Sequence, residues 1–244
     1  MLELKGAATS LTKIAERTNR KHRTLYDFLE DFLEKEMFLR EENRITRWAQ
    51  NARFPFQKTI EEFDYSFQPC IDQRLMNELA SCRFIQQGEN VIFLGPSGVG
   101  KTHLSIGLGI EAIYKGFDTK FMKMDEFIEL VGDETEDASR IFKLCARPRL
   151  LIFDDIDFYK PEKNASTILF KLIYQRHEKK LSTIFTSNRS FSEWGELFGS
   201  KERASAAIDR ILENAVMINI QGDSYRIKDK LKKIAKLNDE HIPS

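Results

Sequence analysis

Apolar residues recur along the chain with two different periods, which separate a helical N-terminal part from an alternating α/β part. Between positions 25 and 33, apolar residues fall on one face of a helix and acidic residues on the other. The sequence Phe-Pro-Phe at 54–56 ends this helical region, because proline cannot continue a helix. We therefore expect a helical N-terminal domain over residues 1–58 and a second domain over residues 59–244.

The second part alternates short apolar runs with segments of helical periodicity. The run that leads to Asp154 is apolar at every position, as in a strand buried on both faces. Such alternation predicts an α/β fold with a parallel five-stranded sheet flanked by helices. The expected strands are 91–94, 119–124, 150–154, 182–188 and 215–220. The expected helices are 71–84, 104–113, 125–131, 138–145, 165–178 and 203–213.

Composition narrows the class of protein. The chain has 244 residues, of which 41% are hydrophobic, so a sizeable core can form. No apolar run approaches the ~20 residues of a membrane helix, so we expect no membrane partner. The three cysteines form no C-x-x-C pair, so they fit buried thiols in a reducing compartment, which favours the cytoplasm, better than a disulfide or metal framework. The net charge is zero, so any nucleic-acid surface must be a local patch.

The sequence at 91–102, Val-Ile-Phe-Leu-Gly-Pro-Ser-Gly-Val-Gly-Lys-Thr, runs from an apolar strand into G-x-x-x-x-G-K-T. In such a loop, backbone N–H groups surround phosphate oxygens, Lys101 reaches the β- and γ-phosphates, and the Thr102 hydroxyl binds Mg²⁺. The order strand, loop and helix disfavours the alternative of a chance glycine-rich turn. The residues expected to bind ATP are Gly95, Pro96, Ser97, Gly98, Val99, Gly100, Lys101, Thr102 and His103.

Two acids end the third expected strand. Asp154 could hold Mg²⁺ together with Thr102, and Asp155 could polarise the attacking water. Read alone, the pair could equally be a turn that starts a helix. The phosphate-binding loop earlier in the chain favours the magnesium interpretation.

Three further polar residues are candidates for contact with the γ-phosphate. Asn188 ends the fourth expected strand, Arg210 lies on the helix before the fifth strand, and Arg226 follows that strand. An arginine there would neutralise charge that develops during hydrolysis. The alternatives are a helix cap for Asn188 and ordinary surface ion pairs for the two arginines.

Basic residues cluster twice in the N-terminal region, and both clusters could follow the phosphates of double-stranded DNA. The alternative is a solvated helix face, since Glu36, Glu41 and Glu42 are interleaved with the second cluster. The candidate DNA-binding residues are Lys13, Arg17, Arg20, Lys21 and Arg23 in the first cluster, and Arg40, Arg44 and Arg47 in the second.

The chain resembles the IstB-like ATPases, which assist transposition and are related to the DnaC helicase loaders. The resemblance rests on collinear motifs: the segment 90–104, Phe63-Asp64-Tyr65, Thr186-Ser187-Asn188, Glu193-Trp194-Gly195, Asp209-Arg210 and the segment 222–226. It implies an AAA+ fold, ATP and Mg²⁺, a homo-oligomer on DNA, and a transposase of the same insertion sequence as partner.

The resemblance also assigns roles to individual residues. It places Asp154 and Asp155 in the Walker B motif, Asn188 as sensor 1 and Arg226 as a sensor-2-like residue. It implies that Arg210 acts across a subunit interface. Asp155 departs from the glutamate that many AAA+ proteins carry at this position.

Two other functions fit a phosphate-binding loop. A helicase loader of the DnaC type would share the ATPase core and differ in its N-terminal partner region. A small-molecule P-loop kinase would need an acceptor pocket and an arginine-rich lid, and the sequence shows neither. We therefore expect a DNA-binding ATPase that assists a transposase.

Overall fold

The computed structural model describes residues 4–20, 24–132, 136–156 and 161–225. The chain divides into two compact units, Met1–Gln50 and Asn51–Ser244, and residues 51–58 belong to the second. Among the helices in the described ranges, none is both long and apolar enough to cross a membrane.

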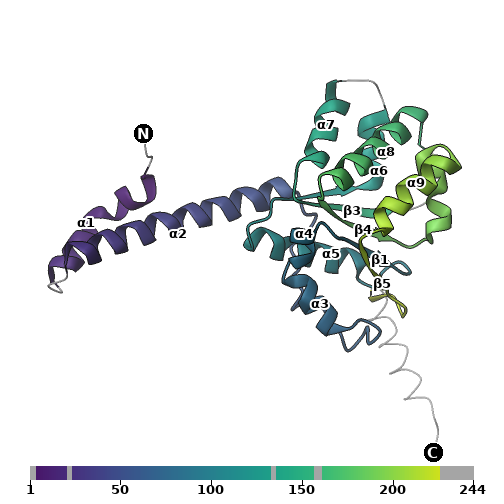
Figure 1. Cartoon of the computed structure of the whole chain (residues 1–244). Coiled ribbons are helices and arrows are strands. Elements are labelled where there is room, and N and C mark those ends of the chain that lie inside the picture. Colours follow the sequence, from purple (N-terminus) through teal and green to yellow (C-terminus); the bar gives the residue numbers. More distant parts are fainter. Residues whose placement is uncertain (1–3, 21–23, 133–135, 157–160, 226–244) are drawn as a thin grey trace, which may run out of the picture. The chain divides into compact units, whose positions relative to one another are not determined.

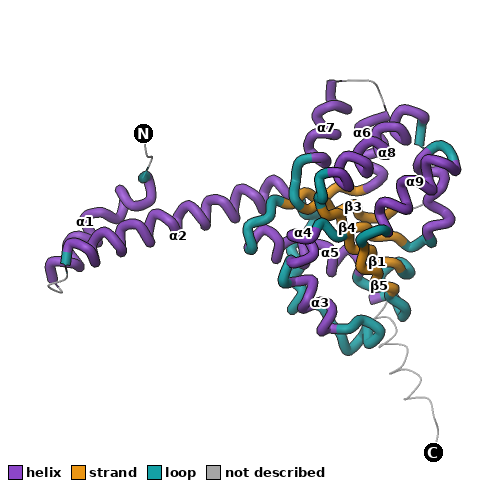
Figure 2. Tube along the Cα trace, in the orientation of Figure 1, coloured by secondary structure: helices purple, strands orange, loops and turns teal. Residues whose placement is uncertain are grey.

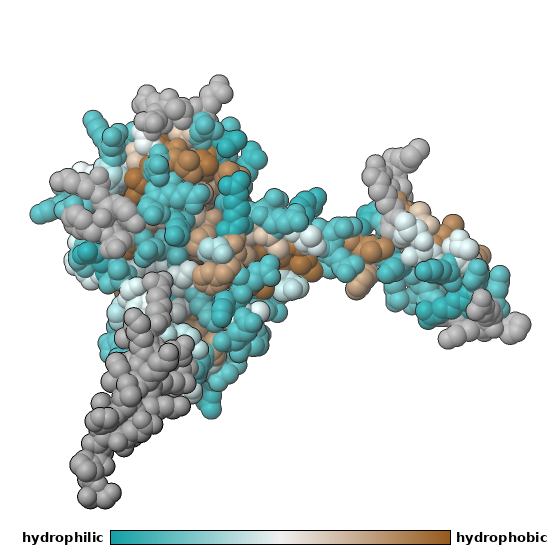
Figure 3. Space-filling view, turned by 180° about the vertical axis from the view of Figure 1, so that it is seen from behind, coloured by the Kyte–Doolittle hydropathy of each residue, from teal (hydrophilic) through white to brown (hydrophobic). Residues whose placement is uncertain are grey.

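The first unit is built from two helices, α1 (Lys5–Arg20) and α2 (Leu25–Ala52), the second of which runs past the unit's end. Thr24 and Asp27 start α2 by mutual capping: Thr24 N donates to Asp27 Oδ2 at 2.7 Å, and Asp27 N donates to Thr24 Oγ1 at 3.3 Å. Hydrophobic side chains on α2 remain exposed, Leu25 to 80%, and brown atoms mark such side chains on this unit in Figure 3.

The second unit contains one parallel sheet with the strand order β2-β3-β4-β1-β5 (Figure 1). All the strands point the same way, so their carboxyl ends meet at one edge, where α/β proteins bind ligands. Strand β4 lies between β1 and β3, and so between the two strands that carry the predicted phosphate and metal residues. The strands are β1 (Asn90–Leu94), β2 (Thr119–Lys123), β3 (Leu150–Ile156), β4 (Ser182–Ser187) and β5 (Ala215–Asn219).

Helices cover both faces of the sheet (Figure 2). The two faces bury separate hydrophobic clusters, because successive strand residues point to opposite sides: Ile92 belongs to one cluster, Val91 and Phe93 to the other. One face carries α6 (Met124–Gly132), α7 (Glu136–Ala146), α8 (Lys163–Glu178), the 3₁₀ helix η1 (Phe191–Phe198) and α9 (Lys201–Leu212). The other carries α3 (Gln73–Ala80), α4 (Arg83–Gln87) and α5 (Lys101–Tyr114).

The predicted fold class, a parallel five-stranded sheet flanked by helices, is confirmed. Three local expectations were wrong or incomplete. The expected helix 71–84 is two helices, because Cys82 between them adopts a left-handed conformation with φ of 60°. Strand β3 continues past Asp154 to Ile156 through an irregularity in its pairing with β4. The helix η1 was not expected, although its apolar residues Phe191, Trp194 and Phe198 fall at i, i+3 and i+7.

Candidate nucleotide-binding site

The phosphate-binding loop connects β1 to α5 at the carboxyl edge of the sheet. The lysine at the end of this loop points back into it: Lys101 Nζ donates to the carbonyl oxygens of Gly95 at 2.7 Å and Pro96 at 2.8 Å. The side chain is only 8% exposed. The loop therefore holds a buried ammonium group at its centre, where the positive end of α5 also points.

Two glycines allow other segments to pack tightly on this loop. Gly98 and Gly100 have φ of +84° and +102°, which side chains rarely adopt. A Cβ atom would lie 2.0 Å from Ser224 Oγ at Gly98 and 2.4 Å from the ring of Phe63 at Gly100. Tyr225 N also donates to Gly98 O at 2.8 Å. The loop is thus enclosed by the segment before α3 and by the turn after β5.

A buried carboxylate faces the start of α5. Thr102 Oγ1 donates to Asp154 Oδ1 at 2.8 Å, with Oδ2 at 3.1 Å. Thr186 Oγ1 donates to Asp154 Oδ1 at 2.6 Å. Burial raises the pKa of Asp154, and the hydrogen bonds from Thr186 and Thr102 partly offset that rise. The structure therefore brings together Thr102 and Asp154, the two residues predicted to hold Mg²⁺.

Thr186 is a site residue that sequence reasoning missed. Its hydroxyl donates to Asp154 and also accepts from Asp155 N at 2.8 Å, so it links the two acids. Asp155 is exposed and has φ of 58°, a conformation that aspartate tolerates better than most residues. No local signal in the sequence separates Thr186 from its polar neighbours Ser187 and Asn188; the contact with Asp154 arises because β4 lies beside β3 in the sheet.

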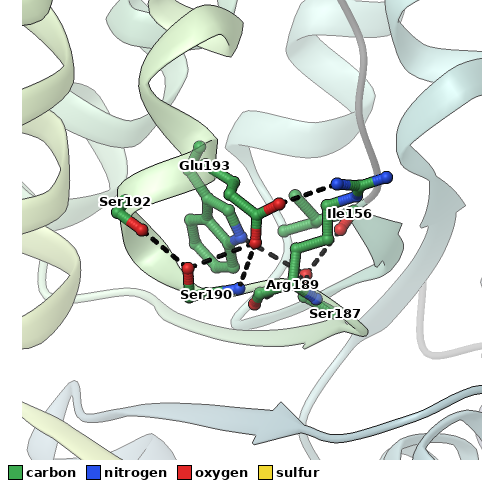
Figure 4. A network of polar contacts seen from close by, with 7 residues as sticks. Ile156, Ser187, Arg189, Ser190, Ser192 and Glu193 are labelled. Atoms are coloured by element: carbon green, nitrogen blue, oxygen red, sulfur yellow. Dashed lines mark hydrogen bonds and ion pairs between the residues drawn. The ribbon is translucent and has the colours of Figure 1, made fainter.

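Asn188 follows the last residue of β4 and is exposed at the same edge. Figure 4 shows the contacts that hold its neighbours. Ser187 Oγ donates to Ile156 O at 2.5 Å and accepts from Trp194 Nε1 at 3.3 Å. Arg189 Nη1 lies 2.7 Å from Glu193 Oε1, in the first turn of η1. Asn188 thus lies in a turn whose flanking residues, Ser187 and Arg189, are both held by side-chain hydrogen bonds.

Arg210 does not lie with the other predicted residues. It is near the end of α9, and β5 then begins beside the first residue of β1, since Ala215 pairs with Asn90. Strand β1 spans about 13 Å at ~3.3 Å per residue step, and the loop is at its far end. Arg210 Nη1 donates to Ala206 O at 2.7 Å, and the guanidinium lies 4.9 Å from the Tyr174 ring centre. A role at the phosphate loop of its own subunit is therefore excluded.

The donor groups fit a nucleotide phosphate and its metal ion. Carboxylate and hydroxyl oxygens are the hard ligands that Mg²⁺ prefers, and Asp154 and Thr102 present both. Asp154 is 4% exposed, and a buried carboxylate gains most from a nearby cation. Lys101 supplies the fixed positive charge that phosphate oxygens need.

Comparison with known proteins agrees with this geometry. The family model described as IstB-like ATP binding protein matches residues 1–233. The chain belongs to this family. The ATP-binding protein of insertion sequence IS21 from Pseudomonas aeruginosa is 36% identical over 95% of this chain and 88% of the relative. That of IS5376 from Geobacillus stearothermophilus is 34% identical over 98% of this chain and 96% of the relative.

A solved structure supports the fold. AMPPCP-bound DnaA from Aquifex aeolicus superposes with a TM-score of 0.55 and 21% identity, over 76% of this chain and 57% of that chain. At this identity the similarity shows the fold alone. The predicted membership of the IstB-like family and the AAA+ type of P-loop fold are both confirmed.

His103, which we expected to contact ATP, makes its described contacts with the segment before α3. Its Nε2 lies 2.7 Å from the carbonyl oxygen of Thr59, which can only accept, so this nitrogen carries the proton. Burial lowers the pKa of His103, which favours the neutral ring. Its ring also packs edge-on against Phe63 at 5.3 Å. His103 therefore positions the segment before α3 against the loop.

The candidate DNA-binding residues in the described ranges lie on helices of the first unit. Lys13 and Arg17 are exposed on α1, and Arg47 is exposed on α2. Arg40 Nε bonds Glu36 Oε1 at 2.7 Å, and Arg44 pairs with Glu41 while packing on the Trp48 ring. The interleaved glutamates thus reduce the positive field of the second cluster. Lys21, Arg23 and Arg226 lie outside the described residues, as does the side chain of Arg20.

Proposed function

We propose that this chain is a Mg²⁺-dependent ATPase that assembles on double-stranded DNA and assists the transposase of its insertion sequence. The observation that carries the proposal is the contact of Thr102 with Asp154 beside the loop that contains Lys101. Its relatives are named for insertion sequences, which favours transposition over helicase loading. The site of action would be the bacterial cytoplasm.

In the proposed reaction each polar residue has a separate task. Thr102 and Asp154 hold Mg²⁺, which neutralises phosphate charge when bound. Asp155 accepts a hydrogen bond from the attacking water, and its left-handed backbone turns the carboxylate out of the strand toward solvent. Asn188 contacts the γ-phosphate from the neighbouring strand end. Arg226, which follows the turn after β5 in the sequence, is proposed to add a further phosphate contact.

Arg210 is proposed to act on ATP bound by a neighbouring copy of the chain. It is half-buried, and packing on Tyr174 restricts its movement, so it is a cation held at the surface. A residue that cannot reach its own loop can stabilise charge only at another subunit's site. This role requires a homo-oligomer.

DNA contact is proposed for the helical N-terminal domain. Lys13, Arg17 and Arg47 are exposed, and Arg44 pairs with the exposed Glu41, an ion pair that a phosphate could replace at small cost. Arg40 is exposed but pairs with Glu36, which is buried, so Arg40 would meet a phosphate while it keeps this contact. These side chains offer phosphate contacts without a base-reading motif, so binding should be largely independent of sequence.

Substitution of the loop lysine tests the proposal. Lys101→Ala should abolish ATP binding, measured by displacement of a fluorescent ATP analogue, because its ammonium is the charge at the loop's centre. The far-UV circular dichroism spectrum should not change. Lys171→Ala, an exposed lysine on α8, is the matched control and should bind ATP normally. Normal ATP affinity in a folded Lys101→Ala protein would refute the nucleotide site.

A further inference from the structure

An aromatic groove lies on the surface of the second unit between α7 and α8. Helix α8 packs against both α7 and α9 (Figure 1). The groove has a volume of about 550 Å³, and its walls include the rings of Phe142, Phe170 and Tyr174. The Tyr174 side chain is 43% exposed. A solvent-open surface that is rich in aromatic side chains is typical of a protein interface.

The groove continues directly to Arg210. The Tyr174 ring that lines the groove also packs on the Arg210 guanidinium at 4.9 Å. Both residues lie at the amino edge of the sheet, because α8 ends just before β4 begins and α9 ends just before β5 begins. The charged residues that line the groove are Lys171, Lys179 and Glu178. Together with Arg210, they make this surface aromatic and basic.

Two segments far apart in sequence form a second surface, beside the phosphate-binding loop. We call residues 59–72 the connector and residues 220–225 the β5 turn. They are joined by a hydrogen bond from Gln68 Nε2 to Asp223 O at 2.8 Å. Neither segment contains a basic residue, so the surface that they form is acidic. Their acidic residues are Glu61, Glu62, Asp64, Asp72 and Asp223.

A pair of aromatic rings marks the junction of these two segments. The rings of Phe67 and Tyr225 pack edge to face at 5.3 Å, and Tyr225 is 51% exposed. We call this pair the knob. It lies next to the phosphate-binding loop, since Tyr225 N donates to Gly98 O at 2.8 Å. Phe67 N donates to Asp64 Oδ1 at 3.2 Å, so a carboxylate lies beside the knob.

The two surfaces complement each other in charge and in the kind of side chain that they present. We propose that the knob of one copy of this chain packs into the groove of the next copy. Arg210 borders the groove and the phosphate-binding loop borders the knob, so this contact brings Arg210 toward the loop of the neighbouring copy. The inference rests on the proposed action of Arg210 on a neighbour's ATP, and it names the surfaces that make this action possible.

The positions of the two surfaces determine the type of assembly. The groove lies at the amino edge of the sheet and the knob at the carboxyl edge, so each copy offers one of each. Copies therefore join head to tail, and every contact leaves one groove and one knob for further copies. Such a contact builds a ring or a helical filament rather than a closed dimer.

Charge reversal on one surface at a time tests the inference on the full chain. The groove variant carries Lys171→Glu and Lys179→Glu, and the knob variant carries Glu61→Lys and Asp223→Lys. All four side chains are exposed, so these changes leave the core intact. Assembly is measured by sedimentation velocity with Mg²⁺ and AMPPCP, a non-hydrolysable ATP analogue. DNA is omitted, because monomers bound side by side on DNA would resemble an assembly.

Each variant alone should assemble more weakly than wild type, because like charges then face each other at every contact. We expect a loss of at least about tenfold in the association constant, which corresponds to ~1.4 kcal/mol per contact. Lys115→Glu is the matched control. Lys115 ends α5 as Lys179 ends α8, but it lies on the other face of the sheet, so this variant should assemble as wild type does.

A mixture of the two variants gives the most specific result. The groove variant keeps its acidic knob, which fits the unchanged groove of the knob variant. At the other contact both charges are reversed, so they attract again. Assembly should therefore return in the mixture although neither variant assembles well alone.

Two results would overturn the inference. One is a groove or knob variant that alone assembles as readily as wild type. The other is a mixture that does not assemble although both variants still bind a fluorescent ATP analogue. If the groove variant does not bind this analogue, the milder pair Lys171→Gln and Lys179→Gln replaces it, and wild-type assembly by that protein counts against the groove. Wild-type protein that binds AMPPCP but stays monomeric would instead refute the proposed action of Arg210 in trans, and the inference with it.

Discussion

Removal of the Thr186 hydroxyl should disturb both acids of the site. Thr186→Val keeps the shape of a side chain that is 1% exposed, so no cavity forms. It removes the donor to Asp154 Oδ1 at 2.6 Å and the acceptor for Asp155 N at 2.8 Å. A hydrogen bond to a charged group contributes about 1.5–3 kcal/mol, and an unpaired buried N–H costs about 1–3 kcal/mol. Because Asp155 N is partly buried, we expect the free energy of unfolding to fall by about 2–4 kcal/mol.

Urea denaturation followed by tryptophan fluorescence measures this loss, since Trp194 is buried beside the end of β4. Thr186→Ser is the matched control: it keeps the hydroxyl and should lose only about 1 kcal/mol for the missing methyl group. The hydroxyl also lowers the pKa of Asp154, so in Thr186→Val the acid limb of Mg²⁺-dependent ATP hydrolysis should move to higher pH. Equal stability and equal pH profiles of the Val and Ser variants would refute this reasoning.

Three further predictions follow from the site. Folding raises the pKa of Asp154, so the stability that this carboxyl group contributes is full below its unfolded pKa and is lost as the pH rises through its folded pKa. Without Mg²⁺, Asp154→Asn should therefore be at least as stable as wild type at pH 7 in a thermal melt. The same variant should lose Mg²⁺-dependent ATP hydrolysis. Mixing Lys101→Ala with Arg210→Ala protein should restore some hydrolysis at mixed interfaces, and no recovery from co-assembled variants would contradict the role in trans. Changing Arg40, Arg44 and Arg47 together to Ala should weaken duplex DNA binding in a fluorescence anisotropy titration. The slope of log binding constant against log salt concentration should become shallower by about 0.9 per lost phosphate contact. An unchanged slope would mean that this helix face does not contact DNA.

The sequence alone predicted those parts of the fold and of the site that carry a local signal. The loop around Lys101 has a fixed spacing, and the strands of a buried parallel sheet are continuous apolar runs. Element order therefore predicted the sheet and the edge where the site lies. Thr102 and Asp154 followed, because that edge brings the strand ends together.

The remaining parts of the site depend on contacts between distant segments. Gln68 and Asp223 are 155 positions apart, and neither carries a local signal of the contact. Thr186 and Asn188 are both polar and near the end of one strand, so composition could not decide which one touches Asp154. Cys82 and Asp155 adopt left-handed conformations, where tertiary packing overrides local preference. Neither residue is a glycine, so the sequence does not predict a left-handed backbone at these positions.

Steady-state hydrolysis of ATP by the purified chain, with and without Mg²⁺ and duplex DNA, tests the central claim most directly. The account predicts hydrolysis that requires Mg²⁺ and rises with protein concentration and with DNA, because Arg210 must come from a neighbouring subunit. Asp155→Asn should bind ATP with normal affinity and hydrolyse it poorly. Hydrolysis by Asp155→Asn at the wild-type rate, or a wild-type rate per subunit that is independent of protein concentration and DNA, would contradict the account.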